Sequence, residues 1–93
     1  MAEQVRLEAV VTGRVQGVGF RYHVLQQARA LDLVGFVRNR WDGAVEVVAE
    51  GEKAQVDRLL SYLQVGPRSA WIIDVETQWQ AATGQFKSFE VRF

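Results

Sequence analysis

The chain has 93 residues, no cysteine, one histidine, and eleven basic residues balanced by eleven acidic ones. Its length fits a single domain, residues 1–93, and the lack of cysteine excludes a disulfide framework, a cysteine-ligated zinc site and a thiol nucleophile. Its zero net charge argues against non-specific binding to nucleic acid or to an anionic membrane.

The first half of the chain predicts a strand, a helix and a second strand. Apolar residues alternate with other residues from Val5 to Thr12, which is typical of a strand with one buried face. Apolar residues recur at helical spacing from Arg21 to Leu33, and Val34-Gly35 ends this helix. Phe36 to Trp41 is the second predicted strand, and Asp42-Gly43 then predicts a two-residue hairpin turn.

The second half predicts a strand, a helix and two further strands. The Val-rich run from Ala44 to Glu50 is a strand, and Glu52 to Gln64 has the apolar period of a helix, which Gly66-Pro67 ends. Ala70 to Trp79 and Phe86 to Phe93 are the last two strands. This order predicts a ferredoxin-like βαββαβ sandwich of the α/β type with an additional strand, in which two helices cover one face of an antiparallel sheet.

A loop with three glycines lies between the first strand and the first helix. The first N–H groups of a helix lack intrahelical partners, and the helix dipole favours negative charge there. Glycines allow the N–H groups of the loop to face the same point, and Arg21 adds a planar charged group suited to phosphate oxygens. By themselves the glycines also fit an ordinary turn, because they match neither a Walker loop nor a dinucleotide fingerprint. The predicted phosphate-binding residues are Val15, Gln16, Gly17, Val18, Gly19, Phe20 and Arg21.

Two longer segments resemble a known family. Residues 13–24, Gly-Arg-Val-Gln-Gly-Val-Gly-Phe-Arg-Tyr-His-Val, closely resemble one signature of the acylphosphatases, and residues 35–46 resemble the second. The resemblance extends over nearly the full chain length. It implies the same sandwich fold and the hydrolysis of acyl phosphates. It also implies that the catalytic Arg and Asn of the family correspond to Arg21 and Asn39 here.

The residue types near the predicted cradle agree with this chemistry. Asn39 cannot accept a proton near neutral pH, but its amide can hold a water. An acyl phosphate suits such a site because its carboxylate leaving group, with a conjugate acid of pKa about 4, departs without protonation. We expect Asn39 to orient a water for in-line attack on a phosphoryl group that Arg21 and loop N–H groups hold. This scheme needs no metal, cofactor or covalent intermediate, and inorganic phosphate should be both product and competitive inhibitor.

Several residues have a more ordinary interpretation. His23 lies off the apolar stripe of its helix, so we expect an exposed side chain rather than a general base. The three tryptophans are predicted to pack in the core or on the sheet rather than to form a ligand cage. Four arginines around the expected site are predicted to be solvated surface residues, namely Arg14, Arg38, Arg40 and Arg68.

Other functions of the same fold are alternatives. An RNA-binding module would carry basic and aromatic residues in the strand from Ala44 to Glu50, which has neither. Small-molecule sensing domains, and the related domain of a carbamoyl-transfer maturation factor, usually belong to longer chains. No apolar run approaches transmembrane length, and the N-terminus does not resemble a signal peptide. We therefore expect a free-standing cytoplasmic monomer that acts on a small-molecule substrate, without nucleic-acid or membrane partners.

Overall fold

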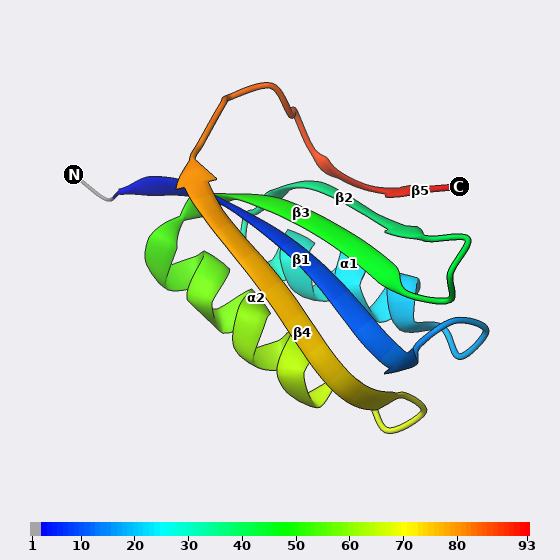
Figure 1. The fold of residues 1–93 in the computed structure, drawn as a ribbon. Coiled ribbons are helices and arrows are strands. Elements are labelled where there is room, and N and C mark those ends of the chain that lie inside the picture. Colours follow the sequence, from blue (N-terminus) through cyan, green and yellow to red (C-terminus); the bar gives the residue numbers. More distant parts are fainter. Residues whose placement is uncertain (1–2) are drawn as a thin grey trace.

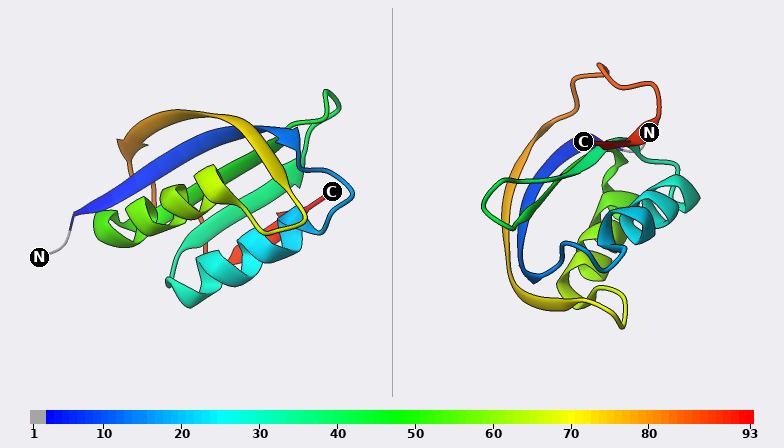
Figure 2. Two further views of the ribbon diagram at one scale, coloured as in Figure 1. Left: turned by 90° about the horizontal axis from the view of Figure 1, so that it is seen from below. Right: turned by 90° about the vertical axis from the view of Figure 1, so that its right-hand side faces the viewer.

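The computed structural model describes residues 3–93, which form one five-stranded sheet and two helices (Figure 1). The elements are β1 (Gln4–Arg14), α1 (Phe20–Ala30), β2 (Val34–Asn39), β3 (Val45–Glu52), α2 (Lys53–Val65), β4 (Trp71–Ala81) and β5 (Phe89–Arg92). Both helices lie on the same face of the sheet (Figure 2). The predicted fold and order of elements are confirmed, and the element ends differ from the prediction by one to three residues.

The sheet is mixed rather than wholly antiparallel. Its strand order is β4-β1-β3-β2-β5, and three of its pairings are antiparallel, whereas β5 runs parallel to β2. The direction of β5 follows from the chain path. Since β4 ends and β2 begins at the same end of the sheet, residues 82–88 cross that end to the opposite edge, and β5 starts beside the beginning of β2 (Figure 1).

The core lies between the sheet and the two helices. Alternate residues of β1 and β3 face the helices, and in α1 and α2 the apolar stripe expected from the sequence is buried. The largest fully buried side chains on the helices are Phe20, Val24, Val56, Leu59 and Leu63. Burying each such side chain contributes roughly 1.5–3 kcal/mol. This packing fixes the start of α1, where the candidate site lies.

A buried carboxylate holds the connection between β4 and β5. Glu50 of β3 is only 3% exposed. It accepts hydrogen bonds from the Thr83 amide (3.0 Å), the Thr83 hydroxyl (2.8 Å), the Gly84 amide (3.0 Å) and the Arg6 guanidinium (3.1 Å). Burial alone would raise the pKa of Glu50, but these hydrogen bonds outweigh it and keep the pKa below its ordinary value. Glu50 therefore fixes the path by which the chain reaches β5.

The turn between β2 and β3 is one residue longer than predicted. The Arg40 amide donates to Ala44 O (2.8 Å), and the Gly43 amide donates to Arg40 O (3.3 Å), so residues 41–43 form the loop. Gly43 has a φ of 93°, which a glycine adopts readily. An Asp-Gly pair fits both loop lengths, and the cross-strand pairing of Asn39 with Val45 selects the longer one.

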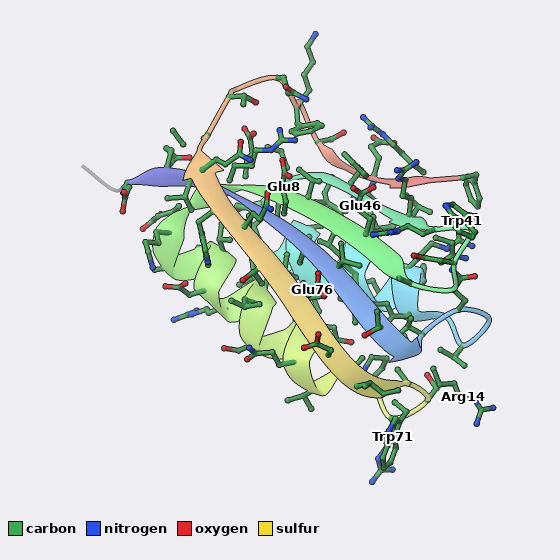
Figure 3. The ribbon with its side chains drawn as sticks, in the orientation of Figure 1. Glu8, Arg14, Trp41, Glu46, Trp71 and Glu76 are labelled. Carbon is green, nitrogen blue, oxygen red and sulfur yellow. The ribbon has the colours of Figure 1, made fainter. Side chains whose placement is uncertain are left out.

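The expectation that all three tryptophans pack in the core or on the sheet is wrong. Trp41 is 96% exposed and Trp71 is 71% exposed. Figure 3 shows both side chains, with Arg14, directed away from the sheet at one end of the molecule. Trp79 is 40% exposed, and the Lys53 ammonium lies 5.2 Å from its ring centre. The turn tip and the start of β4 offer Trp41 and Trp71 no second layer to pack against.

Neither helix within residues 3–93 has the length and apolar character that a membrane span requires.

Candidate active site

The glycine loop, residues 15–19, joins the end of β1 to the start of α1. Gly17 and Gly19 have φ values of 74° and 76°, in the left-handed region that favours glycine. A Cβ at Gly17 would meet nothing within 4 Å, so backbone conformation rather than space requires glycine there. Val15 and Phe20, each 1% exposed, hold the two ends of the loop in the core.

Two side-chain hydrogen-bond anchors hold the loop against its neighbours. The Gln16 amide donates to Arg40 O (2.7 Å) and Ala44 O (2.8 Å) on the β2–β3 turn. From the other side, the Ser69 hydroxyl donates to Val18 O (2.9 Å). Within residues 3–93, no backbone N–H from residues 16–19 donates to a backbone carbonyl. The loop is therefore fixed without the use of its N–H groups.

A cavity of about 290 Å³ lies against this loop. It is lined by Val15, Gly17, Gly19, Phe20, Arg21, Tyr22, Asn39, Val91 and Phe93. Five of the seven predicted phosphate-binding residues are thus among its lining, together with Asn39. Gln16 and Val18 are not, and the Gln16 side chain instead anchors the loop. The arrangement brings the start of α1, the end of β2 and the end of β5 to one place.

Arg21 is the second residue of α1 and is partly buried. Its guanidinium carbon lies 4.9 Å from the centre of the Phe93 ring. Within residues 3–93, it forms no ion pair with an acidic side chain. The ring has no hydrogen-bond acceptor that could occupy the guanidinium, so the N–H donors of Arg21 remain available for an anion.

Asn39 is the last residue of β2 and pairs with Val45 across the sheet. Its Oδ1 is buried and has no hydrogen-bond partner within residues 3–93. Leaving such an acceptor unsatisfied costs about 1–3 kcal/mol. A polar group held in this way beside an anion cradle is well suited to accept a hydrogen bond from a water or a ligand.

The other polar residues singled out from the sequence lie outside this cavity. His23 is exposed, as predicted. Arg14 and Arg68 are exposed, while Arg38 and Arg40 form ion pairs with acidic residues of the β2–β3 hairpin. The prediction of solvated surface residues agrees with the exposed Arg14, Arg38 and Arg68, whereas Arg40 is only partly exposed.

A larger cavity, about 570 Å³, lies at the opposite end of β1. It is lined in part by Lys53, Asp57 and Trp79. Lys53 is already paired with Asp57 at 3.0 Å and lies over the Trp79 ring. The positive charge of Lys53 is thus balanced by Asp57. The cavity at the glycine loop is therefore the better anion site despite its smaller volume.

The sequence did not predict that residues at the end of β5 line the cavity at the glycine loop. Val91 and Phe93 reach the cavity because β5 pairs with β2. It also missed the anchoring roles of Gln16 and Ser69. No local pattern marks these contacts, since each joins segments that are distant in the chain.

Known proteins resemble this chain in both sequence and structure. The sequence profile of the acylphosphatase family matches residues 7–91. The acylphosphatase of Acaryochloris marina is 44% identical over 91 residues, which are 98% of this chain and 97% of that protein. The crystal structure of acylphosphatase from Bacillus subtilis matches with a TM-score of 0.92 at 31% identity, over 96% of this chain and 99% of that one. An acylphosphatase from Coxiella burnetii matches with a TM-score of 0.86 at 35% identity, over 97% and 94% of the two chains.

Proposed function

The chain belongs to the acylphosphatase family and is a hydrolase of acyl phosphates, and from this premise we propose how its residues carry out the reaction. The observation that carries the proposal is the position of Asn39. Its buried, unpartnered Oδ1 belongs to a residue that lines the same cavity as Arg21 and the glycine loop. A phosphoryl group and a water can therefore be bound next to each other.

Arg21 and the backbone N–H groups of Val15 to Phe20 bind the phosphoryl oxygens. The guanidinium offers a planar pair of donors, and the start of α1 adds the favourable end of the helix dipole. These donors stabilise the oxygens most strongly as negative charge spreads over them in the transition state. The hydrogen bonds from Gln16 and Ser69 keep the loop in place, so that little reorganisation is needed when the substrate binds.

Asn39 orients the attacking water. Its Oδ1 accepts a hydrogen bond from the water, which leaves a lone pair on the water oxygen for in-line attack on phosphorus. A new P–O bond forms as the P–O bond to the acyl group breaks, and the electron pair leaves with the carboxylate. The water proton moves to a phosphoryl oxygen. Because this leaving group has a conjugate acid of pKa about 4, the reaction needs no general acid and no metal.

The test is the hydrolysis of benzoyl phosphate in excess EDTA. Arg21→Lys keeps the charge but loses the planar donor pair, so turnover should nearly vanish and inhibition by inorganic phosphate should weaken. Asn39→Ala should lose about a hundredfold or more in turnover and still bind phosphate. Arg14→Ala is the matched control, because Arg14 is exposed and does not line the cavity. Wild-type turnover in Asn39→Ala would refute the role of Asn39, and loss of wild-type activity in EDTA would refute the metal-free mechanism.

We also propose that the chain acts as a cytoplasmic monomer without a nucleic-acid partner. Glu8, Glu46 and Glu76 lie on the sheet face away from the helices, where an RNA-binding sheet would carry aromatic and basic residues (Figure 3). The zero net charge supports the same view. Light scattering during gel filtration, with and without RNA, tests the monomeric state and the absence of RNA binding.

A further inference from the structure

The cavity beside Arg21 has an apolar side that the mechanism above does not use. Three of its lining residues, Tyr22, Val91 and Phe93, present apolar surface that is not fully buried in the core. Phe93 is fully exposed and Tyr22 is 58% exposed. Exposed aromatic side chains that line a cavity beside a substrate-binding arginine indicate contact with a ligand.

The sheet places Phe93 next to Arg21. β5 pairs with β2 up to Arg92, which lies opposite Arg38, and Phe93 follows directly. The Arg92 guanidinium lies 4.1 Å from the centre of the Phe36 ring, which fixes the end of β5 on the sheet. The Phe93 ring then lies 4.9 Å from the Arg21 guanidinium carbon. Because the ring is fully exposed, core packing does not account for its position.

The acyl group of a bound substrate must lie close to this ring. It is joined to phosphorus through a single oxygen, and Arg21 holds the phosphoryl group in the mechanism proposed above. We propose that Phe93, with Tyr22 and Val91 beside it, forms an apolar wall that receives the acyl group. This wall makes the enzyme prefer acyl phosphates with aromatic or long apolar acyl groups over acetyl phosphate. The inference rests on the proposed function.

The wall has a distinct kinetic signature. It contacts a part of the substrate that changes little between the ground state and the transition state, so its contribution should appear in KM rather than in kcat. A residue that only positioned Arg21 would instead affect every substrate equally. It would also affect binding of inorganic phosphate, which has no acyl group. The two roles can therefore be separated.

The experiment compares wild type, Phe93→Ala and Phe93→Leu on benzoyl phosphate and acetyl phosphate, with phosphate inhibition measured in parallel. In Phe93→Ala we expect KM for benzoyl phosphate to rise about three- to tenfold, as for the loss of one aromatic contact. Acetyl phosphate should change by less than about twofold and phosphate inhibition should stay constant, because neither uses the wall. Phe93→Leu should keep part of the apolar contact. Trp41→Ala is the matched control, since Trp41 is exposed and does not line the cavity.

Each other outcome overturns the inference. An equal loss on both substrates with weaker phosphate inhibition would show that Phe93 acts only on Arg21. An unchanged ratio between the two substrates would show that the ring does not contact the acyl group. In both cases the wild-type enzyme remains an active acylphosphatase with an Arg21-dependent site. A wild type that hydrolyses neither substrate would instead refute the proposed function, and the inference with it. Unchanged melting temperatures confirm that the variants are folded.

Discussion

Replacing Glu50 with glutamine should destabilise the protein at neutral pH and make its stability less dependent on pH. The carboxylate is 3% exposed and accepts hydrogen bonds from Thr83, Gly84 and Arg6. A glutamine can still accept from the two backbone amides through its carbonyl oxygen, and the Thr83 hydroxyl can turn to accept from the new amide. The hydrogen bond from the charged Arg6 is lost, because the amide NH2 offers it no acceptor.

The expected loss follows from that single interaction. A hydrogen bond to a charged group contributes about 1.5–3 kcal/mol, so Glu50→Gln should cost about 2 kcal/mol of unfolding free energy at pH 7. Arg6 keeps its second partner, Glu8, at 2.8 Å, which prevents a larger loss. In a domain of this size, about 2 kcal/mol corresponds to a fall in melting temperature of roughly 8–16 °C.

The pH dependence has a defined sign. The pKa of Glu50 is lower in the folded protein than in the unfolded chain. Its contribution is therefore complete above the unfolded value of about 4.3, and it is lost as the pH falls through the folded value. Urea unfolding followed by circular dichroism between pH 7 and pH 3 should show the wild type and Glu50→Gln converging at low pH. The exposed Glu76→Gln is the control. A difference that stays constant across this range would refute the reasoning.

Three further predictions concern the glycine loop. Gln16→Ala removes the two hydrogen bonds to the β2–β3 turn, so turnover of benzoyl phosphate should fall about tenfold or more through loop displacement, whereas the exposed Gln26→Ala should match wild type. Gly17→Ala and Gly84→Ala both place alanine at a φ near 74° with open space around its Cβ. Each substitution should lower the free energy of unfolding, measured in urea, by about 1–2 kcal/mol. Only Gly17→Ala should lose activity, and equal activities of the two variants would contradict phosphate binding by the glycine loop. Inorganic phosphate at a hundredfold excess over its Kd should stabilise wild type by about 2.7 kcal/mol in thermal unfolding, and an equal shift in Arg21→Ala would contradict phosphate binding at this site.

The features predicted correctly from the sequence are those set by local patterns. The apolar stripes of α1 and α2 identify their buried faces, because helical periodicity alone determines which side chains meet the sheet. The direction of β5 was not predictable, since residues 89–92 show the same alternation whether they pair parallel or antiparallel. The exposed Trp41 was also missed, because it was predicted to be the last residue of a strand, and only the three-residue turn places it beyond the sheet.

Some features of the candidate site were likewise predictable from the sequence, and others were not. Arg21 and the glycines are neighbours in the chain, so their meeting at a helix start could be expected from the sequence. The placement of Asn39 beside them was expected from the family resemblance. Phe93 and the anchoring side chain of Gln16 depend on which strands pair and where a turn closes. Such tertiary contacts leave no periodic signal in the residues that form them.

The strand order also bears on how fast the protein folds. Among the four strand pairings, only that of β2 with β3 joins elements that are adjacent in the chain, whereas β1 pairs with β3 and β4, and β5 pairs with β2. Such a topology has a high contact order, so loops must close at an entropic cost before their pairings form. The glycine loop at the start of α1 is held against the β2–β3 turn by the Gln16 side chain. Phosphate should therefore bind no partly folded species in which the β2–β3 turn has not formed, and phosphate protection in a refolding experiment would mark the moment when this turn meets the loop.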